Sequence, residues 1–185
     1  MSTPLMEQYR RIKEKNRGAV LLYRMGDFYE MFDEDAVLAS RVLGLTLTSR
    51  NHGESARTPL CGFPFHALDR YLGKLIGAGH RVAVCEQVED PKTAKGLVKR
   101  DIIEVVSRGT AVSPDLLSEK SNNFIASFFI SGDAAGLAVA DVSTGEFFCA
   151  DVPSAKLLTE LEKLAPSEVL HAETGDKNGA LKSLK

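Results

Sequence analysis

With 185 residues, the chain is long enough for one good-sized domain, or for one domain and part of another. Its 44% hydrophobic content is ordinary for a globular protein and excludes a disordered or low-complexity chain. The formal net charge of −2 neither indicates nor excludes a nucleic-acid partner, because phosphate binding depends on a local basic patch. Residues 1–107 sum to +2, from 16 Lys and Arg against 14 Asp and Glu, and residues 108–185 sum to −4, from 7 against 11.

The cysteines and the N-terminal segment indicate the cellular compartment of the protein. Cys61, Cys85 and Cys149 lie far apart among apolar residues and form no Cys-x-x-Cys pair, so we expect buried, reduced thiols. The N-terminal segment has no apolar stretch typical of a secretory signal. No apolar run approaches the roughly 20 residues needed to span a bilayer. We therefore expect a cytoplasmic protein without membrane contact.

Residues 1–107 predict a compact mixed α/β domain, because strands and helices alternate along them. Thr3 and Pro4 are typical of a helix start, and residues 19–23 predict a buried strand. After a tight turn at Met25–Asp27, a second helix is expected from Phe28 to Leu43. The remaining expectations are strands over 45–48, 81–88 and 99–107, a polar loop over 49–58, an irregular return to the core over 60–64, and a helix over 66–75.

Residues 108–123 are polar and contain Gly, Pro and Ser, so they predict a linker between two domains. Beyond the linker we expect a second α/β domain, over residues 124–185. Its predicted elements make up only half of a layered domain, so we interpret the chain as a fragment of a larger protein. They are strands over 124–130, 136–142 and 145–152, a helix over 154–164, and a fourth strand over 168–171.

The common catalytic motifs are absent from the sequence. It contains no GxxxxGK[ST] loop, GxGxxG, HExxH or GxSxG motif, and its four histidines form no cluster. Asp141 and Glu146 flank a predicted hairpin, and two such acids are candidates for a metal-dependent nuclease. In the alternative interpretation, Asp141 starts the turn through its own side-chain hydrogen bonds and Glu146 points outward from a strand.

Two interpretations are open for the segment Asp27-Phe28-Tyr29-Glu30. In the first, Asp27 and Glu30 form a capping box at the start of the helix, and both aromatic side chains belong to the core. In the second, Phe28 points outward, because adjacent helical residues lie about 100° apart and Tyr29 takes the inner face. An exposed aromatic beside a carboxylate, on a stiff turn after a buried strand, suits a wedge that contacts something outside the protein.

Five segments, in order along the chain, resemble the N-terminal mismatch-recognition domain of bacterial MutS proteins. Phe63 and Phe65 stand where the family pattern has an aliphatic residue and a Tyr. The second region is similar to the start of the connector domain of the same family, which implies an RNase H-like fold. The five segments are Tyr23–Phe32, Leu47–Arg50, Gly62–Ala67, Val84–Val88 and Val106–Thr110.

This resemblance implies specific roles for five residues. Phe28 and Glu30 would be the Phe-x-Glu element. Its aromatic ring enters the minor groove and stacks on one base of a mispair, its carboxylate hydrogen-bonds that base, and the DNA is kinked there. Arg50 and Arg100 match positions at which the family places basic residues toward DNA. Met25 would line the wedge. We expect Glu30 to cap the helix in the free protein and to read a base on DNA.

The resemblance also separates this fragment from its parent protein. ATP, Mg²⁺, a self-dimer and the partner MutL belong to the parent, and we expect neither a cofactor nor catalysis in the fragment itself. Its expected partner is double-stranded DNA with mismatches or small loops. Two other classes stay open: a metal-dependent nuclease using Asp141 and Glu146, and a structural adaptor in which the Phe28 ring is buried.

Overall fold

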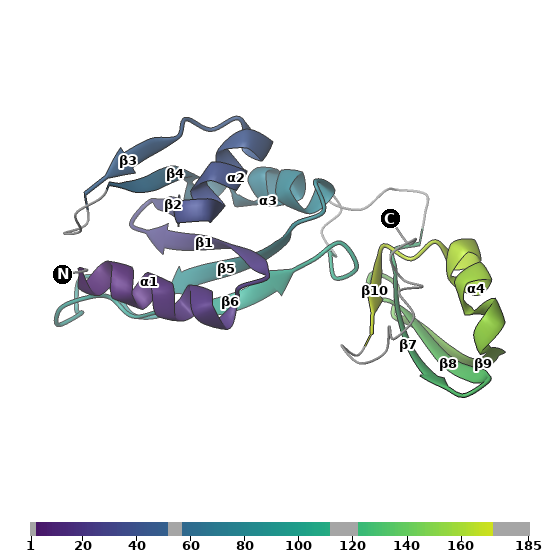
Figure 1. Cartoon of the computed structure of the whole chain (residues 1–185). Helices are drawn as coiled ribbons and strands as arrows, with labels where there is room; N and C mark the ends of the chain where they lie inside the picture. The colour runs from purple at the N-terminus through teal and green to yellow at the C-terminus, as the bar shows by residue number, and fades with distance from the viewer. Residues whose placement is uncertain (1–2, 52–56, 112–121, 172–185) are drawn as a thin grey trace. The chain divides into compact units, whose positions relative to one another are not determined.

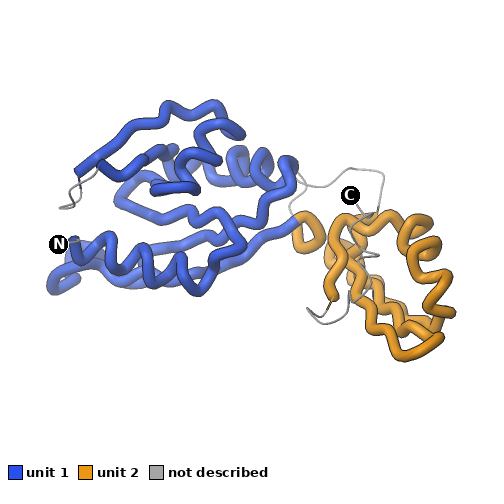
Figure 2. Tube along the Cα trace, viewed as in Figure 1, with its two compact units in different colours: residues 1–107 blue, residues 108–185 orange. Residues whose placement is uncertain are grey.

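The computed structural model describes residues 3–51, 57–111 and 122–171. The chain divides into two compact units, residues 1–107 and residues 108–185 (Figure 2). Most of the expected linker, residues 112–121, lies outside the described residues. Both units combine helices with a mixed sheet, which confirms the predicted α/β class.

Unit 1 is built on a six-stranded sheet with the order β3-β4-β2-β1-β5-β6 (Figure 1). Only β1 and β5 run parallel, and the other neighbours are antiparallel. Its elements are α1 (Pro4–Lys15), β1 (Ala19–Met25), β2 (Phe28–Phe32), α2 (Asp33–Leu43), β3 (Thr48–Arg50), β4 (Thr58–Pro64), the 3-10 turn η1 (Phe65–Ala67), α3 (Leu68–Gly77), β5 (Arg81–Gln87) and β6 (Arg100–Val106).

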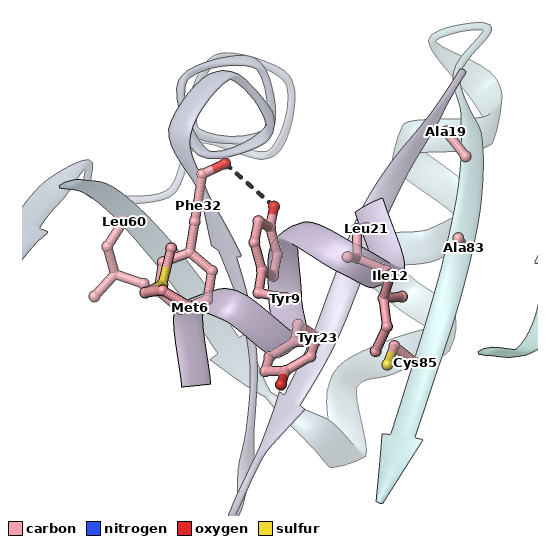
Figure 3. Close-up of a cluster of buried hydrophobic side chains, with 10 residues drawn as sticks. All are labelled: Met6, Tyr9, Ile12, Ala19, Leu21, Tyr23, Phe32, Leu60, Ala83 and Cys85. Carbon is pink, nitrogen blue, oxygen red and sulfur yellow. Dashed lines mark hydrogen bonds between the residues drawn. The ribbon is translucent and has the colours of Figure 1, made fainter. Parts of the chain in front are cut away.

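Helix α1 covers one face of this sheet. Thr3 caps it by accepting from the Met6 amide at 3.4 Å, as its position before Pro4 predicts. The Tyr9 ring packs edge-on against Tyr23 and Phe32, with centroids 5.4 and 4.8 Å apart. Its hydroxyl donates to the Phe32 carbonyl (Figure 3). The buried cluster under α1 comprises Met6, Tyr9, Ile12, Ala19, Leu21, Tyr23, Phe32, Leu60, Ala83 and Cys85.

Helices α2 and α3 pack against the opposite face. Cys61 Sγ on β4 donates to the Ala36 carbonyl of α2 at 3.3 Å. The Phe63 ring, two residues further along β4, stacks on Tyr71 of α3 with centroids 4.4 Å apart. The sheet is therefore buried on both sides at β1, which explains the apolar run over residues 19–23.

Several expected elements of unit 1 are corrected by the structure. The helix expected from Phe28 is wrong: Phe28–Phe32 is strand β2, and α2 begins at Asp33. The irregular return expected over 60–64 is the regular strand β4, which pairs with β2. The strand expected over 45–48 lies at Thr48–Arg50 instead and extends into the expected loop. Residues 52–56 of that loop lie outside the described part.

Unit 2 is a four-stranded sheet with the order β10-β7-β8-β9 and one helix. β7, β8 and β9 form the predicted antiparallel meander, and β10 pairs parallel to β7. Buried Leu157 and Leu161 of the helix pack on this sheet. The elements are β7 (Phe124–Ser131), β8 (Ala134–Asp141), β9 (Glu146–Pro153), the 3-10 turn η2 (Ser154–Lys156), α4 (Leu157–Leu164) and β10 (Glu168–Leu170).

The cysteines only partly follow their prediction. Cys61 and Cys85 are buried free thiols, and burial raises their pKa values to about 11 and about 12. Cys149 is exposed on β9, so its predicted burial is wrong. No helix in the described part of the chain has the length and apolarity that crossing a membrane requires.

Candidate functional site

A tight β-hairpin, formed by β1 and β2, carries the residues singled out in the sequence. The two-residue loop Gly26-Asp27 joins the strands, with Met25 directly opposite Phe28. Gly26 has a φ of +57°, and a glycine with positive φ at the first loop position is typical of a type II′ hairpin. Glu30 therefore lies on a strand and cannot complete a helical capping box, so the expectation that it caps in the free protein is wrong.

The strand geometry places Phe28 and Glu30 side by side. Residues two apart on a strand share a face, whereas in a helix they would point in nearly opposite directions. Phe28 lies between Met25 and Pro64 on the neighbouring strands, and Glu30 lies between Tyr23 and Gly62. The Phe-x-Glu spacing thus presents a ring and a carboxylate on the face of the sheet that α1 only partly covers.

The Phe28 ring is 46% exposed, although Tyr29 beside it and Met31 are buried against the opposite face. Phe28 points outward as expected, but strand alternation rather than a helical wheel is the cause. An aromatic ring held in water gains no free energy from burial. Its exposure contradicts the structural-adaptor alternative, which required a buried ring.

Glu30 is partly buried beside the ring. Its Oε2 atom is inaccessible to solvent and has no hydrogen-bond partner among the described residues. Burial raises the pKa of this carboxyl, and the Arg50 guanidinium opposes the shift. A buried acceptor without a partner is costly, so a turn of the Glu30 side chain that brings Oε2 to a hydrogen-bond donor outside the protein would be favourable.

Gly62 provides the space into which Glu30 folds back. A Cβ atom at this position would lie 2.8 Å from the Tyr29 carbonyl oxygen and 3.4 Å from Glu30 Cγ. The first distance is far too short, and the atom concerned belongs to the backbone of β2. Only glycine therefore allows β4 to approach β2 this closely opposite Glu30.

Substituting Gly62 with Ala is expected to lower the free energy of unfolding by about 1–3 kcal/mol, because the added methyl group forces β2 and β4 apart. Urea unfolding of the chain, followed by circular dichroism, measures this. Gly77→Ala is the matched control, since a Cβ there meets nothing within 4 Å and alanine favours the helix. Wild-type stability in Gly62→Ala would contradict the packing argument.

The raised pKa of Glu30 makes stability depend on pH. The folded state holds this proton more tightly than the unfolded chain, so stability falls as pH rises from the ordinary value of 4.5 through the raised pKa. Glu30→Gln is therefore expected to be more stable than wild type at pH 7, with the difference shrinking as pH falls through that window. Urea unfolding across this pH range checks the prediction, with exposed Glu146→Gln as control. A difference that does not vary with pH would contradict it.

All five predicted site residues lie on the α1 face of the sheet. Strand register places Arg50 opposite Thr58 and Arg100 opposite Gln87, both on the face shared by Glu30 and Tyr23. Met25 is partly buried and packs between the core cluster and Phe28. Arg50 is exposed. Its strand partner Thr58 and the partner of Phe28, Pro64, are six residues apart on β4, so the Cα atoms of Arg50 and Phe28 are offset by roughly 20 Å along the strand direction.

Arg100 is placed differently from a solvated arginine. Its Nε donates to the Arg24 carbonyl at 2.6 Å, and its Nη1 donates to Val98 O and Gln8 Oε1 at 2.8 and 3.2 Å. The guanidinium also lies 5.0 Å from the Tyr23 ring centroid. Arg100 thus ties the end of β1 to β6 and α1, and its predicted contact with DNA stays a prediction.

The sequence patterns do not predict a second group of polar side chains, Arg24, Tyr29 and Glu86, on the opposite face of the hairpin. Arg24 of β1 and Glu86 of β5 form an ion pair, Nη1 to Oε1, at 3.2 Å. Tyr29 donates its hydroxyl to the same Glu86 oxygen. A signal is present in the sequence, because Arg24 and Glu86 each follow a run of apolar residues in a strand, and charges in such positions need partners.

The described acids of unit 2 do not gather into a metal site. Asp141 is buried and accepts from the Asn123 amide at 3.0 Å and from the Ser143 amide and hydroxyl at 2.9 and 2.6 Å. The hydroxyl bond from Ser143 is the main cause that lowers its pKa. Glu146 is exposed at the start of β9. In the described part of the chain no three His, Cys, Asp or Glu side chains gather as metal ligands would, and nothing favours the nuclease alternative.

The family models and the curated relatives that match this chain belong to the same family. The family model described as MutS domain I matches residues 3–115, and that of MutS domain II matches residues 123–185. Proteins named DNA mismatch repair protein MutS are 52% identical over 169 residues in Methanothrix thermoacetophila and 45% identical over 180 residues in Caldanaerobacter subterraneus. These alignments cover 91% and 95% of this chain but only 20% and 21% of the relatives, so the chain spans about a fifth of their length. The chain belongs to the MutS family and comprises sequence of its domains I and II.

Proposed function

We propose that this chain recognises mispaired bases in double-stranded DNA through the β1–β2 hairpin, within a longer DNA mismatch repair protein. Phe28 enters the minor groove and stacks on one base of the mispair, Glu30 hydrogen-bonds that base, and the duplex kinks at this step. The observation that carries the proposal is the exposed Phe28 ring beside a carboxylate with an unpartnered oxygen, on one strand face. The names of the relatives support it.

The exposed ring suits a reader that must accept any base. Every base has a π-face, so stacking on an aromatic side chain tolerates all sequences and contributes about 1–3 kcal/mol per base. Selectivity then comes from the DNA, because a mispair or a small loop is already weakly stacked and is cheaper to open than a matched step. Apolar side chains that wedge between base steps from the minor groove kink the duplex in the same way.

Glu30 adds discrimination against correct pairs. Its carboxylate approaches a groove flanked by phosphates, whose field opposes the charged form, as burial already does in the free protein. An opened base that offers a donor, or a nitrogen that accepts the proton of the neutral acid, satisfies Glu30. A stacked, correctly paired base offers neither, so Glu30 then opposes binding.

Arg50 and Met25 have supporting roles in this proposal. Arg50 lies further along the same face of the sheet, where it contacts a phosphate of the duplex and contributes affinity without sequence preference. Met25 packs beside the ring at the hairpin tip and fills the groove around it. Arg100 contributes to the site by fixing the end of β1 through its bond to the Arg24 carbonyl. Any N–H group of Arg100 that is not used within the protein contacts a phosphate.

A photo-crosslinking experiment tests the stacking contact. A full-length MutS protein that carries this chain as its domains I and II is mixed with a duplex that has 5-iodouracil in a mispair, and the mixture is irradiated. We expect the cross-link to map to Phe28. The same analogue in a matched pair serves as the control and should give little product. A cross-link that maps to another residue would overturn the assignment.

Further activities belong to the longer protein, and we propose them only there. The sequence of this chain contains no phosphate-binding loop, so ATP hydrolysis with Mg²⁺ is assigned to other parts of the parent. Dimer formation and the contact with MutL are proposed for the parent protein as a whole. Phosphate contacts supply much of the affinity of DNA-binding proteins. The isolated chain, which lacks the remaining contacts, is therefore expected to bind mismatched DNA weakly.

A further inference from the structure

We propose that Arg24 is a positioning residue, which holds the hairpin tip rigid while the ring of Phe28 is driven between bases. This inference rests on the proposed function and extends it to the face of the hairpin that does not meet DNA. Arg24 lies directly opposite Tyr29 in the strand pair, on the face turned away from Phe28.

The Arg24 guanidinium contacts three separate parts of unit 1. Its Nε donates to the carbonyl of Gly26 in the hairpin loop at 2.5 Å. Its Nη1 donates to Glu86 on β5 at 3.2 Å. The plane of the guanidinium lies over the Phe65 ring, with Cζ 3.8 Å from the centroid. One side chain thus joins the loop to a strand on one side and to the segment after β4 on the other.

Two further bonds close this network around the loop. The Tyr29 hydroxyl donates to the same Glu86 oxygen that accepts from Arg24. The Phe65 amide donates to the Asp27 carbonyl at 2.9 Å, so the second loop residue is fixed as well. The Arg24 and Glu86 side chains are only 17% and 24% exposed, which limits competition from water and salt.

The physical need for such a network follows from the work that the tip does. A two-stranded hairpin alone is only marginally stable, so its tip has little stiffness of its own. Opening a base step costs free energy, and the DNA resists the ring as the ring enters. A yielding tip would bend away, and the base would stay stacked. Contacts from β5 and from the segment after β4 prevent this.

The chemistry of arginine explains why this residue occupies the position. Its planar group carries five donors in a fixed fork and stacks on aromatic faces, so it can bond the loop and Glu86 while covering Phe65. Lysine would offer a single charged centre without the planar stacking surface. Arg24→Lys is therefore expected to lose part of the effect although it keeps the charge.

The test measures mismatch preference, defined as the affinity for a duplex with one mispair divided by the affinity for the same duplex fully paired. The double variant Arg24→Gln with Glu86→Gln, in the full-length protein defined above, leaves the net charge unchanged. We expect its mismatch preference to fall about tenfold with little change in affinity for paired DNA, because only insertion needs the rigid tip. Tyr29→Phe, which removes one hydroxyl and no charge, should cause a smaller loss in the same direction.

A matched control uses the exposed ion pair between Glu14, in α1, and Arg17, which follows the helix. Glu14→Gln with Arg17→Gln removes the same two charges far from the hairpin and should leave mismatch preference unchanged. A bend assay, with fluorescent labels at the two duplex ends, should show less kinking in the Arg24 and Glu86 double variant and normal kinking in the control.

The outcomes separate this inference from the proposed function. If Phe28→Ala abolishes mismatch preference while the Arg24 and Glu86 double variant and Tyr29→Phe retain it, the positioning role is wrong and the wedge stands. If Phe28→Ala retains the preference, the proposed function fails. An equal fall of both affinities, together with a lower melting temperature, would overturn the positioning role in favour of general structural support.

Discussion

Replacing Phe28 with Ala is expected to abolish the mismatch preference of the full-length protein while leaving weak binding to paired DNA. The ring is 46% exposed and packs little within the protein, so its removal should hardly alter folding. The lost stacking, about 1–3 kcal/mol, corresponds to a roughly 5- to 150-fold fall in affinity for mismatched DNA. Fluorescence anisotropy with paired and mispaired duplexes measures both affinities at one fixed salt concentration.

The control for Phe28→Ala is a second exposed ring. Phe147 on β9 is 68% exposed in unit 2, so Phe147→Ala removes comparable apolar surface at a distance from the hairpin in sequence. It should leave both affinities unchanged. Survival of the mismatch preference in Phe28→Ala would show that another residue carries the wedge.

Glu30→Gln is expected to raise affinity for paired DNA, by about tenfold, and to alter affinity for a mispair much less. Glutamine keeps the shape of the side chain and can both donate and accept, as a neutral acid does. It lacks the charge that the phosphates repel at a correct pair. Mismatch preference should therefore fall because background binding rises, a pattern opposite to that of Phe28→Ala.

The pH dependence of binding gives this prediction a second readout. A carboxyl whose pKa is raised by burial, and further by phosphates, takes up a proton more readily as pH falls. Wild-type affinity for paired DNA should therefore increase toward low pH more steeply than that of Glu30→Gln. The exposed Glu146→Gln should retain the wild-type slope. Equal slopes in wild type and Glu30→Gln would contradict a repulsive role for Glu30.

Much of the fold could be predicted from local patterns. The Thr3-Pro4 helix start, the β-branched strand over 100–106 and the meander of unit 2 depend on neighbours in sequence, and the structure contains all three. The sequence allows two interpretations of Asp141, a metal-binding acid or a residue that starts a turn. The hydrogen bonds that Asp141 accepts from Ser143 select the turn. Local hydrogen bonding of this kind is specified within a few residues.

The second strand of the hairpin, β2, is predicted as the start of a helix, and the reason is physical. Tyr29, Phe32 and Ala36 recur at helical spacing, so the pattern of α2 extends without a visible break into β2. What decides the conformation is pairing with β4, which lies some thirty residues further along the chain. A nearer signal was present, since Gly26-Asp27 between two apolar runs is typical of a two-residue hairpin loop.

For the candidate site, the sequence supplies candidate residues but not their arrangement. The family resemblance points to Phe28 and Glu30, and strand register explains why both lie on one face. The internal role of Arg100 and the network of Arg24 with Glu86 depend on contacts between strands far apart in sequence. A charge in a mainly apolar strand indicates that a partner is needed, but local periodicity does not say which strands are neighbours, so the partners themselves come from the structure.

A double-mutant cycle of Phe28→Ala and Glu30→Gln tests the central claim most directly, because that claim is that one strand presents both side chains to the same base. Mismatch preference is measured for wild type, both single variants and the double variant in the full-length protein. Side chains that engage one base as a unit are coupled, so Glu30→Gln should have almost no further effect once Phe28 is absent. Effects of the two substitutions that simply multiply would contradict the claim, since they would show that ring and carboxylate act at separate places.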